Sequence, residues 1–341
     1  MKLITDDKIP DVSAFFTHCD EIIYLPGEQI QRTDLIDADL LLVRTVTHVD
    51  EKLLQNTTVK WVGTATTGTD HIDTQWLSKN HIVFADAAGA NANAVLDYVL
   101  SCVMGLKNQR YLAEKNGIAG IIGCGRIGRL VAKTLKTLGF QVLCYDPLLT
   151  DKPDFDFVEL ETLLRESHFI TLHTPLTKTG SHPTYHLINQ QQLSWVQPNT
   201  VLLNCSRGAV INQTALLNTK NIFICLDVWE NEPHISMDLL QKVIIGTPHI
   251  AGYSIQAKFR ATQMMYESAA SFFGWPPSHH TLAIQHTPST YDPFVHTQQF
   301  RTAFHDQIDP EMIKKIFIEE RKRYALRDEN HDLAGTGNII C

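Results

Sequence analysis

IAGIIGCGRIG, residues 118–128, joins an apolar run to the glycine pattern G-x-G-x-x-G. In this pattern the first glycine permits a tight turn, the second lets the backbone approach a pyrophosphate, and the third allows a helix to pack closely on a strand. A helix is expected over residues 126–138, and its N-terminus would face an anion. The stretch therefore predicts a dinucleotide-binding turn. The cofactor contacts expected from it are Gly123, Gly125, Arg126, Ile127 and Gly128.

An acidic residue follows the next predicted strand. Residues 141–145 have the pattern of that strand, and Asp146 comes directly after it. A carboxylate at this position accepts the ribose hydroxyls of an adenosine and repels a 2′-phosphate. We therefore expect the cofactor to be NAD rather than NADP.

Short apolar runs alternate with helical patterns along the chain, which predicts parallel sheets. Before the glycine turn, the expected strands are residues 2–5, 39–45, 60–64 and 82–85. From the turn onward there are six, as a doubly wound nucleotide domain requires: 118–122, 141–145, 169–172, 201–204, 222–227 and 243–245. The expected fold class is α/β, with two doubly wound parallel-sheet domains, a Rossmann NAD domain and a flavodoxin-like substrate domain.

Two long helical patterns indicate where the chain passes between these domains. Residues 91–115 form the first, which leads out of the substrate domain, and residues 254–273 form the second, which returns to it. The amphipathic stretch 298–327 is too short for a core of its own, because such cores need about 40 residues or more. The expected domains are 1–92 completed by 257–285 for the substrate, 93–256 for NAD, and 286–341 as a small C-terminal α+β segment.

Charge and composition argue against several classes of protein. Lys plus Arg number 29 and Asp plus Glu number 37, and the net charge of -8 argues against binding to nucleic acid. The N-terminus lacks the apolar core of a secretory signal. The most apolar helix candidate, residues 95–106, is shorter than the roughly 20 residues that a membrane span needs. We therefore expect a cytoplasmic protein that binds neither nucleic acid nor membrane.

Cysteine and histidine spacing gives no metal site. The 7 cysteines form no C-x-x-C pair and are odd in number, so neither a disulfide framework nor a zinc cluster is expected. The 16 histidines are scattered without ligand spacing, apart from His279-His280. We assign no metal.

Three chemically distinct side chains each follow a predicted strand of the NAD domain, at the sheet edge where ligands of open α/β sheets bind. Arg207 can hold a carboxylate bidentately. His249 can take the proton of a hydroxyl group, and Glu232 can orient His249 and favour its imidazolium. Each residue alone also fits a structural role, but together they indicate hydride transfer at a hydroxy acid. Arg44 ends another predicted strand and suits a phosphate, although an ordinary surface ion pair explains it equally well.

These segments resemble the D-isomer-specific 2-hydroxyacid dehydrogenases. The resemblance covers roughly residues 2–273. The segments that carry it are 123–128, Asp146, 173–176, 204–208, 227–233 and 248–252. A closer resemblance, to members that oxidise a phosphorylated four-carbon hydroxy acid, is carried by 44–47, 63–71, 227–230 and 249–253.

The resemblance implies oxidation of 4-phospho-D-erythronate at C2 by NAD, giving 3-hydroxy-2-oxo-4-phosphooxybutanoate, in pyridoxal 5′-phosphate biosynthesis. It places Arg207 and Glu232 in the active site, with His249 as proton donor or acceptor. It also implies a homodimer formed through the C-terminal segment. The further cofactor contacts that it implies are Asp146, Thr174, Cys205, Ser206, Arg207, Asp227, which would lie near the nicotinamide carboxamide, and Gly252. The implied substrate contacts are Thr45, Thr66 and Tyr253.

Two alternatives stay open at this point. The same chemistry could act on 3-phosphoglycerate or a similar hydroxy acid, although 341 residues leave little room for a regulatory domain. The chain could instead be a non-enzymatic NAD(H)-sensing binding protein, like the co-repressors that resemble this family. The excess of Asp and Glu over Lys and Arg, and the absence of a basic segment, weigh against the sensor.

Overall fold

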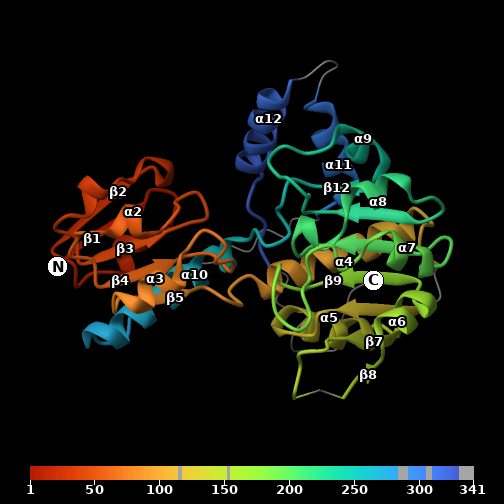
Figure 1. The fold of residues 1–341 in the computed structure, drawn as a ribbon, viewed down its shortest axis with the longest axis horizontal. Coiled ribbons are helices and arrows are strands. Elements are labelled where there is room, and N and C mark those ends of the chain that lie inside the picture. The colour runs from red at the N-terminus through yellow and green to blue at the C-terminus, as the bar shows by residue number, and fades with distance from the viewer. Residues whose placement is uncertain (114–116, 152–153, 283–290, 305–308, 330–341) are drawn as a thin grey trace. The chain divides into compact units, whose positions relative to one another are not determined.

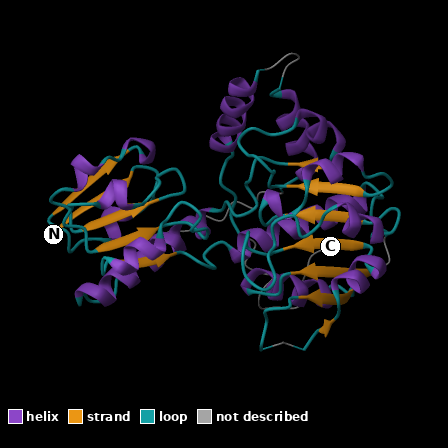
Figure 2. Ribbon diagram, viewed as in Figure 1, coloured by secondary structure: helices purple, strands orange, loops and turns teal. Residues whose placement is uncertain are grey.

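The structure is a computed structural model and describes residues 1–113, 117–151, 154–282, 291–304 and 309–329. The chain forms two compact units (Figure 1). Unit 1 comprises Met1–Asn93 and Tyr253–Thr287, and unit 2 comprises Ala94–Gly252 and Pro288–Cys341. Each unit is built on its own parallel sheet (Figure 2).

Unit 1 contains a five-stranded parallel sheet in the order β2-β1-β3-β4-β5, which is the flavodoxin-like order. The four strands expected from the sequence are present, and an additional strand, β2, lies at the edge of the sheet. The sequence of β2, EIIYL, is apolar after Glu21, but its side chains are only half-buried or exposed, as at an edge. The strands are β1 Lys2–Asp6, β2 Glu21–Leu25, β3 Leu40–Val43, β4 Trp61–Thr64 and β5 Val83–Asp86.

Alternate residues of the unit 1 strands enter two different cores, as expected for a sheet covered on both faces. Leu40 and Trp61 pack with α10 on one face, and Leu41 and Val62 enter the other core. The helix expected over 254–273 is confirmed as α10, Ile255–Phe273, which begins where the Ser254 hydroxyl accepts a hydrogen bond from the amide of Ala257. The other helices are α1 Val12–Phe15, α2 Glu51–Leu54 and α3 Thr74–Lys79, with 3-10 turns η1 Gly27–Gln29 and η2 Arg32–Leu35.

Unit 2 contains a seven-stranded parallel sheet in the order β12-β11-β10-β9-β6-β7-β8. The strand order reverses beside β6, as in a Rossmann fold. Four of the six expected strands have the expected bounds, and β11 is one residue shorter at each end. The short edge strand β8 is additional, and β12 begins later than expected because Val243 caps the C-terminus of α9. The strands are β6 Ile118–Ile122, β7 Gln141–Tyr145, β8 Asp156–Phe157, β9 Phe169–Leu172, β10 Val201–Asn204, β11 Phe223–Leu226 and β12 Ile245–Gly246.

Helices cover both faces of this sheet. Helices α4 and α5 contribute to one core, and α6 to α9 contribute to the other. The long helix α4 ends at Asn108, earlier than the expected residue 115, and buries Val95, Val99, Val103 and Leu106 as expected. The helices are α4 Ala92–Asn108, α5 Arg126–Thr137, α6 Leu160–Glu166, α7 Gln190–Trp195, α8 Gln213–Asn218 and α9 Met237–Lys242, with the 3-10 turn η3 Gly208–Val210.

The described part of the C-terminal segment forms α11, Pro293–Thr302, and α12, Pro310–Arg323. These helices share the core of unit 2, because Phe300 and Phe317 are buried in the same cluster as Trp229. The hydroxyl of Thr297 in α11 accepts a hydrogen bond from the amide of Gly246 at 2.9 Å. The segment therefore covers the β12 edge of the sheet, which would otherwise expose backbone groups.

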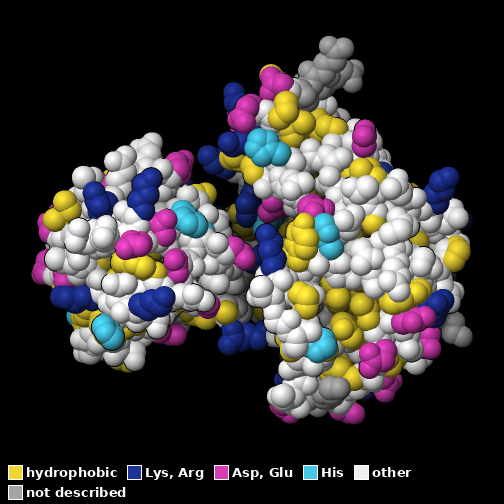
Figure 3. All heavy atoms as spheres, viewed as in Figure 1, with side chains coloured by type: hydrophobic (Ala, Val, Ile, Leu, Met, Phe, Trp, Pro, Cys, Tyr) yellow, Lys and Arg dark blue, Asp and Glu magenta, His cyan; other side chains and the backbone are white. Residues whose placement is uncertain are grey.

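No helix among the described residues is both long and apolar enough to cross a membrane. Within the same residues, no group of three or more His, Cys, Asp or Glu side chains is arranged to hold a metal ion, and the six cysteines are free thiols. Basic and acidic side chains are interspersed on the face of unit 1 that Figure 3 shows. Cys341 lies outside the described residues.

Candidate active site

The three glycines of the 123–128 turn each meet the requirement expected of them. Gly123 has a φ of +88°, and a Cβ there would lie 2.8 Å from the carbonyl oxygen of His173. Gly125 precedes the first residue of α5, and a Cβ there would meet nothing within 4 Å, so the backbone is open to a ligand. A Cβ on Gly128 would lie 1.9 Å from the Gly123 carbonyl oxygen, which shows how closely α5 approaches the turn. Arg126 and Ile127 open α5.

Two polar side chains adjoin this turn. Asp146 follows β7 and accepts hydrogen bonds from the amides of Cys124 at 2.9 Å and Leu148 at 3.2 Å. Thr174 follows β9, and its buried hydroxyl has no hydrogen-bond partner among the described residues. A buried hydroxyl without a partner costs free energy, so it fits a polar ligand at this place. The open turn, the carboxylate and this hydroxyl together fit the pyrophosphate and ribose of NAD.

Replacing Asp146 by Ser is expected to reduce the preference for NAD over NADP at least about tenfold, because the carboxylate that repels a 2′-phosphate is removed. The measurement is kcat/KM for each cofactor. Asp156→Ser, an exposed change in β8, is the matched control and should keep the original preference. An unchanged preference in Asp146→Ser would mean that the ribose is recognised elsewhere.

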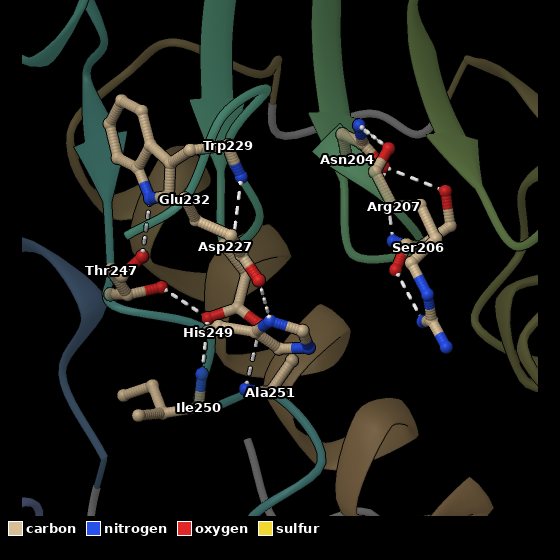
Figure 4. A network of polar contacts seen from close by, with 10 residues as sticks. All are labelled: Asn204, Ser206, Arg207, Asp227, Trp229, Glu232, Thr247, His249, Ile250 and Ala251. Atoms are coloured by element: carbon tan, nitrogen blue, oxygen red, sulfur yellow. Dashed lines mark hydrogen bonds and ion pairs between the residues drawn. The ribbon is translucent and has the colours of Figure 1, made fainter. Parts of the chain in front are cut away.

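The turn after β10 presents Arg207. Asn204 ends the strand, and its side chain accepts hydrogen bonds from the Ser206 amide at 3.0 Å and hydroxyl at 2.8 Å (Figure 4). It also donates to the Arg207 carbonyl oxygen at 3.0 Å. A Cβ on Gly208 would lie 1.9 Å from the Trp229 carbonyl carbon, so the Arg207 turn packs directly on the loop that follows β11. Burial raises the pKa of the Cys205 thiol well above its usual range, which makes this thiol unreactive.

The structure brings Glu232 and His249 into contact. Glu232 Oε1 lies 2.5 Å from His249 Nδ1, and Glu232 Oε2 accepts a hydrogen bond from the Trp229 amide at 3.1 Å. Burial of the Glu232 carboxyl opposes its ionisation, but the adjacent His249 and the charge of Arg321 outweigh burial and lower its pKa. An ionised carboxylate fixed on Nδ1 sets the orientation of the ring and leaves Nε2 for a substrate.

Asp227 builds the turn that carries His249. Its carboxylate is buried and accepts hydrogen bonds from the Thr247 hydroxyl at 2.7 Å, the Ile250 amide at 2.7 Å and the Ala251 amide at 2.9 Å (Figure 4). Its backbone oxygen accepts from the His249 amide at 2.7 Å. These contacts use three of the roughly four acceptor positions of the carboxylate, so Asp227 is mainly engaged in holding the turn.

Arg44 and its neighbours lie at the strand ends of unit 1. Arg44 Nη2 pairs with Asp6 Oδ1 at 2.9 Å, and Asp6 is fully buried. Thr45, beside Arg44, is exposed. The sequence interpretation overlooked Asp6, although its position at the end of β1 is the same signal that singled out Arg44. Tyr253 begins the second stretch of unit 1, and the Lys258 ammonium lies 5.3 Å from its ring centre.

Thr66 belongs to a chain of polar contacts in unit 1. Its hydroxyl lies 2.8 Å from that of Thr64, which lies 3.0 Å from His71 Nε2. Burial lowers the pKa of His71 to about 4, so the ring is neutral near pH 7. Sequence analysis gave no role to Thr64 or His71, because their contact depends on the loop that follows β4.

Acid is therefore expected to weaken folding through His71. The ring titrates near 6.5 when unfolded and near 4 when folded, so the unfolded chain binds more protons between these pH values and the free energy of unfolding falls as pH falls. His71→Asn should reduce the difference in that free energy between pH 7 and 5 by about 2 kcal/mol. Urea unfolding at both pH values tests this, with His81→Asn as the exposed control. An unchanged pH dependence would contradict a neutral buried ring.

A Rossmann sheet that fits NAD, with an arginine and a Glu–His pair at its strand ends, defines an NAD-dependent oxidoreductase of hydroxy acids. Residues 106–251 match the family described as D-isomer specific 2-hydroxyacid dehydrogenase, NAD binding domain. The chain is 48% identical over 274 residues to the erythronate-4-phosphate dehydrogenase of Coxiella burnetii (strain RSA 331 / Henzerling II). The aligned residues cover 80% of this chain and 75% of that protein. The chain belongs to the erythronate-4-phosphate dehydrogenase family.

Two further comparisons extend this result. The erythronate-4-phosphate dehydrogenase of Coxiella burnetii (strain Dugway 5J108-111) is 41% identical over 348 residues, covering 96% of this chain and 93% of that protein. Among solved structures, the D-lactate dehydrogenase from Aquifex aeolicus complexed with NAD and lactic acid has a TM-score of 0.67 and 24% identity, covering 80% of this chain and 96% of that one. The second similarity supports the two-domain fold.

Proposed function

We propose that the chain oxidises 4-phospho-D-erythronate at C2 with NAD, giving 3-hydroxy-2-oxo-4-phosphooxybutanoate, a step of pyridoxal 5′-phosphate biosynthesis. The observation that carries the reaction type is the 2.5 Å contact between Glu232 and His249, on the same sheet edge as the glycine turn. The names of the related enzymes support the choice of substrate.

In this proposal, Arg207 holds the substrate carboxylate and polarises the carbonyl that develops at C2. His249 Nε2 takes the proton of the C2 hydroxyl as the C2 hydrogen leaves with its electron pair. Bound NAD supplies the hydride acceptor. The Glu232 carboxylate stabilises the imidazolium that His249 becomes.

The remaining assignments follow the same proposal. Unit 1 would be the substrate domain, with Arg44, Thr45, Thr66 and Tyr253 as substrate contacts, and unit 2 the NAD domain. A cytoplasmic location is proposed as well. We also propose a homodimer formed through the C-terminal segment, as the resemblance to the family implies. Light scattering on the purified protein tests the dimer.

The test of the activity is NADH formation by the purified protein, comparing 4-phospho-D-erythronate with 3-phosphoglycerate and D-lactate. A 2-oxo acid is added in parallel so that tightly bound NADH can be reoxidised and released. A strong preference for the phosphoerythronate would support the proposal. Preference for another substrate would contradict the substrate assignment, and NADH binding without turnover would favour a sensor.

A further inference from the structure

Arg327, beyond α12 in the C-terminal segment, reaches the turn that carries His249. Its side chain is buried, with 5% of its surface exposed. Nη1 donates a hydrogen bond to the Ile250 carbonyl oxygen at 3.2 Å, and Nη2 donates to that of Ala251. The two residues after His249 are therefore held through their carbonyl groups by a residue more than seventy positions away in sequence.

The same two residues are held through their amide groups by Asp227, as described above. The Ile250-Ala251 backbone thus lies between a carboxylate that accepts from its N–H groups and a guanidinium that donates to its carbonyls. Each of these hydrogen bonds is assisted by a full charge, which makes it stronger than a neutral one. Such a pair of contacts fixes both the position and the rotation of the peptide groups.

His249 needs this support because of its backbone conformation. Its φ is 58°, in the left-handed region that non-glycine residues seldom adopt. Conformations of this kind cost free energy and persist where the surrounding structure imposes them. Loosening the next two residues would let the His249 ring move away from Glu232, and a displacement of about 1 Å is enough to impair catalysis.

Arg327 is itself firmly held. Nη1 also donates to the Tyr324 hydroxyl at 2.8 Å, Nη2 also donates to the Ala94 carbonyl oxygen at 2.6 Å, and the guanidinium lies 5.5 Å from the centre of the Tyr291 ring. The N–H groups of both terminal nitrogens thus have acceptors, which offsets the cost of burying the charge. The segment also contributes a second charge near the site, because Arg321 of α12 lowers the pKa of Glu232.

We propose that Arg327 is a positioning residue for the reaction, which holds the His249 turn from the side opposite Asp227. The C-terminal segment is then a part of the catalytic support of its own chain, in addition to any role in assembly. This inference rests on the proposed function insofar as His249 accepts the substrate proton.

The test compares Arg327→Met with Arg327→Lys. Met keeps the apolar part of the side chain and loses every hydrogen-bond donor. Lys keeps the positive charge and three N–H donors but lacks the planar guanidinium that can donate in two directions at once. Met is expected to lower kcat about thirtyfold to a hundredfold with the dissociation constant for NADH within about threefold, and Lys to lower kcat by less than about tenfold. A packing role alone predicts that Met is at least as active as Lys, and that ranking would overturn the proposal. Arg323→Met, an exposed change in α12, is the control.

Two further measurements keep the outcome decisive. If Arg327→Met does not fold, Tyr324→Phe removes one anchor of the guanidinium and should lower kcat about threefold, and an unchanged kcat would overturn the proposal. Hydrogen exchange of the peptide 247–253 needs no substrate. Exchange of this peptide should be faster in Arg327→Met than in wild type. If Arg327→Met does not fold, the same comparison is made with Tyr324→Phe. Unchanged exchange would refute the positioning role. Wild-type protein that fails to oxidise phosphoerythronate would contradict the proposed function alone.

Discussion

Replacing His249 by Asn is expected to lower kcat about a thousandfold and to leave the affinity for NADH within about twofold. The imidazole Nε2 is the proposed acceptor of the hydroxyl proton, and an amide nitrogen cannot take that proton. Asn tolerates the left-handed backbone that His249 adopts at a φ of 58°, so the turn and the cofactor site should remain intact. Initial rates of NADH formation give kcat, and fluorescence titration gives the dissociation constant.

The chain offers a matched control for this substitution. His81 also has a left-handed backbone, with a φ of 57°, and is exposed in unit 1. His81→Asn therefore repeats the change of side chain in the same backbone conformation and should leave kcat unaltered. If His249→Asn kept its kcat within about tenfold of wild type, the proton would have to be transferred by another group.

The elements that the sequence predicted best are those whose signal is local. The glycine turn is encoded by three glycines at fixed spacing, and Gly123 and Gly128 answer steric requirements within a few residues or at the adjoining strand end, whereas Gly125 leaves its backbone open. Strands β6, β7, β9 and β10 have the expected bounds, because buried parallel strands are continuous apolar runs. The edge strands β2 and β8 were not expected: β8 has only two residues, and β2 is an apolar run whose side chains are exposed or half-buried.

The parts of the site that sequence analysis overlooked depend on contacts between distant segments. Nothing near Arg327 indicates that it contacts the carbonyls of Ile250 and Ala251, because that contact arises only when the C-terminal segment packs on unit 2. Asp227 was expected near the cofactor, but most of its hydrogen bonds go to the turn of His249. The sequence thus singled out the residues proposed to react, whereas the contacts that support them depend on the folded structure.

Replacing Arg207 by Lys is expected to lower kcat/KM about a hundredfold to a thousandfold, which corresponds to about 3–4 kcal/mol. A guanidinium can bind a carboxylate through two parallel hydrogen bonds, whereas an ammonium acts as a single point charge. The turn itself should survive, because Asn204 holds it through the Ser206 amide and hydroxyl and the backbone oxygen of Arg207. Arg165→Lys is the control: it makes the same substitution at an exposed position in α6 and should leave kcat/KM unchanged.

The division of this loss between KM and kcat distinguishes the two tasks proposed for Arg207. Binding the carboxylate equally in the ground state and the transition state affects KM alone, whereas polarising the carbonyl as it forms affects kcat. We expect both constants to change, because the C2 oxygen and the carboxylate are attached to adjacent carbons and one planar guanidinium can reach both. A change in KM alone would restrict Arg207 to substrate binding. Unchanged kinetics would remove it from the site and leave the Glu232–His249 pair as the remaining catalytic element.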